Sequence, residues 1–600
     1  MRKTRTQWYE LLSAVFLFSL LLVLVALRAG IVDRNIGTSI ACQGCFHSSV
    51  FSADLVMFWL ASGALLAAGF IPMRLPGRLL HLAVGLLIVV YVTDLLVFRL
   101  FNYRLFLSDA ALFIAERAAV WDQFSSGVGG AWVAILILLA VAGLLVWLLL
   151  MPATRGRPAR LFLSVTLIFS LTAGLALESP PYVNDWATTN VFSANLATTE
   201  RVRYSPEFEA EIEAKFTGLA AAGLQQHLST AEPQTGRNVI FVLVESWSSW
   251  HSLEFGGTLD WTPEFDKAAQ RGLRFNNFHA IGFSTTNGLV GILAGQKIWS
   301  PFLHMFESPP FYSMWGVERT LPRVFSDSGY ETAFLTTGPI SLYRKGEWMT
   351  DLGFAHVEGN EHPYYADEKR YAFDAPSDAA LYGRGLQWMQ TAASPYLLVL
   401  ETVTTHQPYV DPDSGERSLE KAMRFADRAF GDFLEKLEAI GFFQNGLLVV
   451  VSDHRSMTPV SSEELELFGA GTFSRVPAFM IGANIEPGTF DDRVLSQGDL
   501  VPTFDWWLNG ETSLGPHDAV MLDGSDTTKC AFHARGDRRG LLEVICPEGY
   551  GQVRMEGDRT RFVKSTGFDE QRKQTVLYTV AQERLAGVYR QQQTEEKDID

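Results

Sequence analysis

The chain has 600 residues, of which 48% are hydrophobic and 19% are charged, and its net charge is −17. This length exceeds that of one ordinary domain, and a charged fraction below the usual quarter indicates membrane-embedded segments. An aromatic content of 12% excludes wholesale disorder. Residues 1–180 carry a net charge of +5 and the rest −22, so the acidic larger part argues against broad nucleic-acid binding.

Five apolar runs of 17–21 residues lie in the first third of the chain. Each is long enough to cross a hydrocarbon core of about 30 Å as a helix. The runs are Leu11–Leu27, Leu55–Met73, Leu79–Phe98, Ala131–Met151 and Leu161–Leu177. We therefore expect residues 1–178 to form a transmembrane domain of five helices.

Basic residues are concentrated on one side of these runs. The N-terminus, the segment between the second and third runs and the segment between the fourth and fifth runs carry eight of them: Arg2, Lys3, Arg5, Arg74, Arg78, Arg155, Arg157 and Arg160. The other two loops have mixed charge. The positive-inside rule then predicts a cytoplasmic N-terminus, and five crossings place everything after about residue 178 outside the cytoplasm.

The four cysteines fall into two pairs. Cys42 and Cys45 form a Cys-x-x-Cys motif in the first outer loop, where the spacing is consistent with a disulfide, half of a metal site or a redox pair; a structural disulfide is our default interpretation. Cys530 and Cys546 both lie in the outer part of the chain, and they are candidates for a disulfide that closes a hairpin-like excursion. Disulfides are typical of exported proteins.

Residues 179–236 have the composition of a polar linker with helical segments, and an α/β pattern begins after them. Short apolar runs lie at Val239–Val244, Ala333–Leu335, Tyr396–Leu400 and Leu447–Val451, with helical patterns at Pro376–Thr391 and Ser418–Ala439. Buried strands that alternate with helices indicate a mainly parallel sheet. We assign residues 237–510 to this domain and residues 511–600 to a C-terminal subdomain and tail.

Side chains suited to metal binding or nucleophilic attack follow the predicted strands. Glu245 comes directly after the first strand, Asp453 and His454 follow the run ending at Val451, and a run of hydroxyl residues at 284–286 precedes a helical pattern. In parallel sheets, ligands bind beyond the carboxyl ends of the strands. Carboxylate oxygens and imidazole nitrogens suit Zn²⁺ or Mn²⁺. A hydroxyl at a helix N-terminus beside such an ion can ionise and attack phosphorus.

These residues give the chain a resemblance to the sulfatase and alkaline-phosphatase superfamily. The segments that carry it are Asn238–Ser246, Thr262–Asp266, Gly272–Phe278, Ser452–Arg455 and Asp499–Thr503. Five membrane helices followed by an outer domain are similar to lipoteichoic acid synthase and the related phosphoglycerol transferases. The resemblance covers nearly the whole chain, and it implies an alkaline-phosphatase/sulfatase-like fold for the outer domain.

The resemblance also implies roles for individual residues. It implies a four-ligand site for one divalent metal ion, formed by Glu245, Thr285, Asp453 and His454. The ion is usually Mn²⁺ in the synthases, with Zn²⁺ or Mg²⁺ as alternatives. The threonine would also be the nucleophile, with Ser284 and Thr286 as rivals. His406 matches the synthase histidine that contacts the phosphoglycerol headgroup.

Several positions depart from the family patterns. The synthases grip the headgroup with a Trp and an Arg two residues apart, and the equivalent places hold Tyr343 and Lys345, with Arg344 between them. An aromatic ring and a cation are kept, although Lys lacks the bidentate fork of Arg. Gln497 stands where phosphoethanolamine transferases often carry His, which favours the phosphoglycerol side. The sequence Thr-Thr-Asn-Gly from Thr285 replaces the Cys/Ser-x-Pro-x-Arg motif of sulfatases and disfavours sulfatase activity.

We therefore expect a transferase that moves phosphoglycerol from phosphatidylglycerol, through a covalent Thr285 intermediate, to an extracytoplasmic acceptor hydroxyl of a glycan or polymer. It would be a multi-pass protein of the bacterial cytoplasmic membrane, with its catalytic domain on the periplasmic or extracellular side and no nucleic-acid partner. Three alternatives stay open. They are a phosphoethanolamine transferase acting on lipid A or a glycan, a lipid-headgroup phosphodiesterase that uses water, and a non-enzymatic sensor or scaffold.

Overall fold

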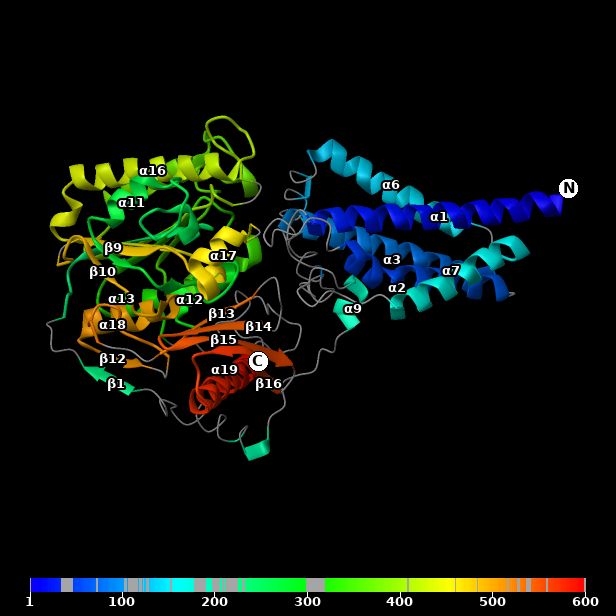
Figure 1. Cartoon of the computed structure of the whole chain (residues 1–600). Helices are drawn as coiled ribbons and strands as arrows, with labels where there is room; N and C mark the ends of the chain where they lie inside the picture. The colour runs from blue at the N-terminus through cyan, green and yellow to red at the C-terminus, as the bar shows by residue number, and fades with distance from the viewer. Residues whose placement is uncertain are drawn as a thin grey trace. The chain divides into compact units, whose positions relative to one another are not determined.

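The computed structural model contains two compact units (Figure 1). One comprises residues 1–115, 123–197 and 458–462, and the other comprises the remainder. The structure describes residues 2–33, 47–71, 74–101, 129–151, 154–176, 190–196, 225–228, 233–297, 319–406, 409–458, 460–482, 484–514, 517–525, 529–535, 541–556 and 559–597, with isolated residues between 105 and 125 and between 205 and 210. Most of the predicted linker and both Cys42 and Cys45 lie outside the described residues.

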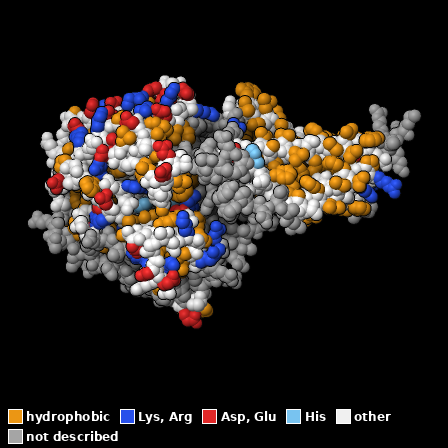
Figure 2. All heavy atoms as spheres, in the orientation of Figure 1, with side chains coloured by type: hydrophobic (Ala, Val, Ile, Leu, Met, Phe, Trp, Pro, Cys, Tyr) orange, Lys and Arg blue, Asp and Glu red, His pale blue; other side chains and the backbone are white. Residues whose placement is uncertain are grey.

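Four helices of the first unit are long and apolar enough to span a membrane. They are α1 (Arg2–Val32), α2 (His47–Phe70), α3 (Arg74–Phe101) and α6 (Ala131–Leu150). Hydrophobic side chains cover this unit in Figure 2, and Trp132 is 80% exposed.

The fifth predicted run forms α7 (Arg157–Ala176), which is not among the four apolar helices. Arg157 and Arg160 lie in its first turn, just before the predicted apolar run. The short helix α9 (Val191–Leu196) follows it in this unit. The five-span topology, and the orientation that depends on it, therefore remain predictions.

A buried polar cluster joins three of these helices. The Arg28 guanidinium donates to Asp54 Oδ1 at 2.5 Å, the Asn190 amide donates to the same oxygen at 2.6 Å, and the Tyr91 hydroxyl donates to the other oxygen. These four side chains are at most 3% exposed. An unpaired carboxylate in an apolar bundle would be costly, so these donors make Asp54 tolerable there.

The second unit contains an eight-stranded sheet, which confirms the α/β prediction. Its strand order is β10-β3-β9-β8-β2-β7-β5-β6. In that order the bounds are Thr489–Asp491, Leu273–Phe275, Ala478–Gly482, Gly446–Ser452, Asn238–Val244, Tyr396–Glu401, Glu331–Thr336 and His356–Glu358. The strands from β8 to β6 run parallel, whereas β9 runs antiparallel to β8. Strand β8 is buried along its whole length because both faces of the sheet are covered.

Helices cover the two faces of this sheet (Figure 1). One face packs against α12 (Thr285–Ala294), α13 (Leu321–Asp327), α14 (Lys345–Leu352) and α18 (Leu500–Asn509). The other packs against α11 (Pro263–Ala269), α15 (Asp378–Met389) and α16 (Leu419–Ala439). A small parallel pair, β4 (Phe278–His279) with β11 (Leu495–Ser496), precedes the one-turn helix η10 (Gln497–Asp499). Because helices cover both faces of the sheet, a ligand would bind at the edge formed by the carboxyl ends of the parallel strands.

The C-terminal part forms a separate antiparallel sheet with one long helix. Its strands are β13 (Ala531–Ala534), β14 (Leu541–Cys546), β15 (Gly549–Glu556) and β16 (Arg559–Thr566), followed by α19 (Glu570–Lys597). A further strand, β12 (Glu511–Leu514), pairs with β1 (Gln225–Leu228).

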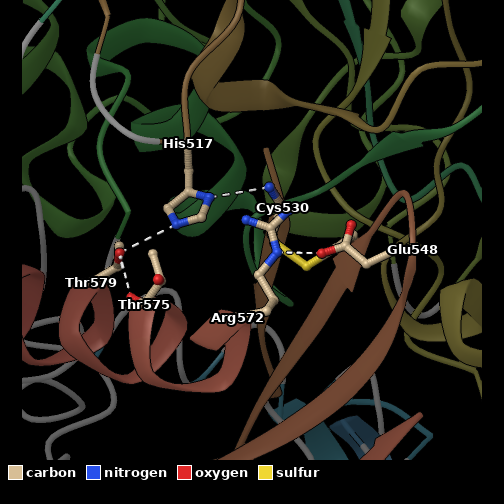
Figure 3. The surroundings of a disulfide bond; sticks show 7 residues. His517, Cys530, Glu548, Arg572, Thr575 and Thr579 are labelled. Atoms are coloured by element: carbon tan, nitrogen blue, oxygen red, sulfur yellow. Dashed lines mark hydrogen bonds and ion pairs between the residues drawn. A yellow bond between two sulfur atoms is a disulfide. The ribbon is translucent and has the colours of Figure 1, made fainter. Parts of the chain in front are cut away.

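A disulfide joins Cys530, the residue before β13, to Cys546, the last residue of β14 (Figure 3). The backbone N–H of Cys530 donates to His517 Nδ1 at 3.1 Å, and His517 Nε2 lies 3.2 Å from the Thr579 hydroxyl of α19. Burial lowers the pKa of His517 to about 3, so the ring is neutral and Nε2 carries the proton that it donates to Thr579. The histidine thus ties the disulfide to the helix.

Replacing Cys530 and Cys546 by serine is expected to lower the free energy of unfolding of this part by about 3 kcal/mol, because the bond closes a loop with a sequence separation of 16. Thermal unfolding of the full-length protein in detergent measures the effect. Wild-type protein in reductant is the control, and the double variant should respond to reductant less than wild type, because only the Cys42 and Cys45 pair remains. An unchanged unfolding temperature in the double variant would contradict the prediction.

Candidate active site

Glu245, Asp453 and His454 meet at the carboxyl edge of the central strands. Glu245 directly follows β2, and the other two follow β8, with Val244 opposite Ser452 in the register of the two strands. All three side chains are at most 3% exposed. One ligand atom from each lies within 4.8 Å of the others. The structure therefore brings three of the predicted metal ligands to one point.

Hydrogen bonds to the backbone orient the Asp453 and His454 side chains and leave one potential metal-binding atom of each available. Asp453 Oδ1 accepts from the N–H groups of Ser246 and His454 at 2.8 and 2.7 Å, whereas Asp453 Oδ2 is buried without a hydrogen-bond partner among the described residues. His454 Nδ1 donates to the Arg455 carbonyl at 2.7 Å, which leaves Nε2 unprotonated. A buried, unpartnered carboxylate oxygen and a free imidazole nitrogen fit a divalent cation.

Ser246 is a contributor that the sequence pattern did not single out. Its φ of 60° is uncommon for a residue other than glycine. This turn lets its N–H reach Asp453, and its hydroxyl donates to Glu245 Oε1 at 2.7 Å. One residue thus orients both acids, and its position directly after a strand-end ligand was the only signal in the sequence.

The acids have opposite pKa shifts. Burial by itself would raise the pKa of Glu245, but the nearby His454 and His406 lower it to about 2. Burial and the neighbouring Glu245 raise the pKa of Asp453 well above its usual range. Burial lowers the pKa of His454, so this ring is neutral and suited to bind a metal. Two adjacent buried carboxylates oppose each other's ionisation unless a cation compensates them.

Thr285 is the first residue of α12 and lies against these groups. Its Oγ1 donates to Glu245 Oε2 at 3.1 Å and lies 3.4 Å from His454 Nε2. The preceding Ser284 caps the helix, because its hydroxyl donates to Asn287 Oδ1 at 3.0 Å and accepts from the Asn287 N–H. The Ser284 hydroxyl is thus committed to a capping box, whereas Thr285 has the position of a nucleophile.

Gly288 allows α12 to approach the metal-binding segment. A Cβ atom at this position would lie 2.3 Å from the carbonyl oxygen of Asp453. A larger residue would therefore push the helix, and Thr285 with it, away from the ligands. The close approach of two backbones explains the need for glycine here.

Three of the four predicted headgroup residues lie at or next to the start of α14 and have different surroundings. Lys345, at the start of α14, donates to both carboxylate oxygens of Glu401 at 2.8 and 2.9 Å. Glu401 ends β7, so this ion pair lies at the same sheet edge as the metal ligands. Arg344 pairs with Glu347, and its side chain is 52% exposed. The side chain of Tyr343 lies outside the described residues.

His406 follows β7 on the same side of the sheet. Together with His454, it lowers the pKa of Glu245. Its ring packs edge-to-face against Phe373, with 4.5 Å between the centroids. Phe373 has a φ of 57°, an outlying conformation for a bulky residue and one that is typical of functional loops. The sequence contained no signal for this contact.

Comparisons with known proteins agree with this geometry. Residues 237–510 match the family model described as Sulfatase. An N-acetylglucosamine-6-O-sulfatase of Bacteroides thetaiotaomicron is 27% identical over 173 residues, which is 27% of this chain and 30% of that protein. Phosphoglycerol transferase I of Citrobacter koseri is 22% identical over 245 residues, which is 38% of this chain and 32% of that protein. The chain thus matches about a third of the length of these relatives.

A solved structure shows the same fold. It is a protein in the alkaline phosphatase superfamily from Vibrio parahaemolyticus, with a TM-score of 0.52 and 17% sequence identity, and the match covers 66% of this chain and 97% of that chain. Residues 237–510 therefore form a Sulfatase-family domain with the fold of this alkaline phosphatase superfamily protein, which confirms the resemblance predicted from the sequence. The matched residues include Glu245, Thr285, Asp453 and His454.

Proposed function

We propose that this enzyme is a membrane-anchored phosphoglycerol transferase that uses phosphatidylglycerol as donor and a glycan or polymer hydroxyl as acceptor. The observation that carries the proposal is the Thr285 oxygen, which lies at a helix N-terminus, 3.1 Å from Glu245 and 3.4 Å from His454. Similarity to phosphoglycerol transferase I supports the transferred group. A threonine in place of the cysteine or serine of the sulfatase motif argues against sulfate-ester hydrolysis.

The proposed reaction has two displacements at phosphorus. In the first, the Thr285 oxygen forms a bond to phosphorus while the bond from phosphorus to the diacylglycerol oxygen breaks; the proton that threonine loses balances the proton that diacylglycerol gains. In the second, an acceptor hydroxyl oxygen binds phosphorus, the bond to Thr285 breaks, and one proton passes from acceptor to threonine. The N-terminus of α12 stabilises negative charge near Thr285 in both steps.

Four residues would hold one divalent metal ion, namely Glu245, Thr285, Asp453 and His454. We propose Mn²⁺, with Zn²⁺ or Mg²⁺ as alternatives. When bound, the ion would supply Lewis-acid stabilisation of the charge that develops on oxygen. His406, Tyr343, Arg344 and Lys345 are the proposed headgroup contacts.

We further propose a bacterial cytoplasmic membrane location with the catalytic domain on the periplasmic or extracellular side. The basic segments on the N-terminal side of the apolar helices support this orientation. Anchoring would keep the enzyme next to its donor lipid.

Incubation with phosphatidylglycerol and with phosphatidylethanolamine in separate reactions tests the donor. Intact-mass analysis is expected to show a phosphoglycerol adduct with the first lipid. A phosphoethanolamine adduct would replace the proposal by a phosphoethanolamine transferase. Headgroup release that is unaffected by an added glycan would indicate a phosphodiesterase.

Replacing Lys345 by methionine is expected to raise the KM for the donor lipid about tenfold or more. The change removes a nearly buried cation at the sheet edge and leaves Glu401 without its partner. The matched variant Arg344→Met, at an exposed pair, is expected to change the KM less than about threefold. Steady-state kinetics at fixed acceptor measure both, and equal effects would contradict the assignment of Lys345.

A further inference from the structure

Gln497 connects the segment that carries the nucleophile with the segment that carries two metal ligands. Its side chain is fully buried. The amide nitrogen donates to the carbonyl oxygens of Ser452 and Asp453 at 2.8 and 2.6 Å. The amide oxygen accepts from the N–H of Ile281 at 3.0 Å, in the loop that leads to Thr285. One side chain therefore bridges β8 and the loop before α12.

The residues around Gln497 hold it in place. Asp499, in the same helical turn, accepts from the N–H groups of Ser496 and Ala519 at 2.6 and 2.8 Å, and it pairs with the buried Lys529. Helix α12 also packs against the Gln497 side chain, since a Cβ atom at Gly291 would lie 3.2 Å from the Cβ of Gln497. The bridge is thus anchored to the C-terminal segment on one side and to the nucleophile helix on the other.

We infer that Gln497 is a positioning residue that sets the separation between Thr285 and the ligands Asp453 and His454. This inference rests on the proposed function. Thr285 and the two ligands come from distant parts of the sequence, so their alignment depends on tertiary contacts between the two backbone segments. A misplacement of about 1 Å in such an arrangement can cost about a hundredfold in rate.

The bridge requires an amide. A glutamine side chain offers two N–H donors and one carbonyl acceptor in one planar group, and Gln497 uses all three functions. Methionine has a similar shape but makes none of these hydrogen bonds. Glutamate keeps the acceptor for Ile281 but places a negative charge against two carbonyl oxygens. Either change leaves buried backbone groups unpaired.

The test compares Gln497→Met with Thr503→Val in the full-length protein. Thr503 is equally buried, and its hydroxyl donates to the Asp499 carbonyl at 2.6 Å and accepts from the Met521 N–H at 2.8 Å. It therefore matches Gln497 in burial but bonds to the C-terminal segment instead. The measurements are unfolding temperature, Mn²⁺ affinity by titration, and kcat and KM for the donor.

We expect both variants to unfold at lower temperature, but only Gln497→Met to bind Mn²⁺ about tenfold more weakly and to lose about a hundredfold in kcat, with the donor KM within about threefold of wild type. Wild-type Mn²⁺ affinity and kcat in Gln497→Met would overturn the inference. Equal losses in Thr503→Val would overturn it too, because they would reflect stability alone.

Gln497→Glu provides the same measurements if the methionine variant does not fold. The Mn²⁺ titration does not depend on the donor lipid. If wild-type protein fails to use phosphatidylglycerol, the proposed function fails, and the inference about Gln497 is decided by Mn²⁺ affinity: weaker binding in the variant supports it and unchanged binding overturns it.

Discussion

Thr285→Ala is expected to eliminate the phosphoglycerol adduct and to lower the rate of transfer by a factor of about 10³ or more. The variant lacks the oxygen that would bond to phosphorus. Intact-mass analysis after incubation with phosphatidylglycerol measures the adduct, and transfer to a glycan acceptor measures the rate. Thr285→Ser keeps a hydroxyl and is expected to retain part of the activity.

The neighbouring hydroxyls provide matched controls. Ser284→Ala removes the helix cap and is expected to cost about 1 kcal/mol of stability, while the adduct still forms. Thr286→Ala is expected to leave the adduct unchanged. An adduct that persists in Thr285→Ala but disappears in either control would assign the nucleophile to that control residue.

Asp453→Asn is expected to weaken binding of the divalent metal by about a hundredfold or more. The change removes one of two buried carboxylate charges that would face the ion. Without metal the variant is expected to be at least as stable as wild type, because burial and Glu245 raise the pKa of Asp453 and thus disfavour its charged form. At the same concentration, Mn²⁺ should raise the unfolding temperature of wild type much more than that of Asp453→Asn, since a ligand that binds only the folded state stabilises it in proportion to its affinity.

Asp378→Asn is the matched control for this experiment. Asp378 is also buried with a raised pKa, but its carboxylate accepts from the backbone N–H groups of Val403 and Thr404. By the same argument its substitution is not expected to lower stability, and Mn²⁺ should still protect the protein. Equal protection of Asp453→Asn by Mn²⁺ would show that this carboxylate does not bind the ion.

Local patterns allowed much of the fold to be predicted. Hydrophobicity over consecutive residues is enough to locate a membrane helix or a buried strand, so α6 and β8 lie where their apolar runs are. Glu245 and Asp453 could be found because parallel strands bring their carboxyl ends to one edge.

Ion pairs between distant segments could not be predicted in the same way. The sequence indicated Lys345 as a cation for the headgroup. Its pairing with Glu401 could not be predicted, because it depends on which strands are neighbours in the sheet. Asp54 stands next to an apolar run without an evident partner in the sequence, and only the packing of the helices brings Arg28 to it.

The amino-acid sequence by itself determined the apolar helices, the α/β pattern, the superfamily and the chemical types of the candidate metal ligands, because each of these depends on residues that are close together along the chain. Only the tertiary structure decided that the Thr285 oxygen faces Glu245 and His454, that Ser246 orients both acids, and that the Gln497 amide joins the two segments. These contacts depend on distances between segments that lie far apart in the sequence, and such distances are established only when the sheet and its covering helices pack.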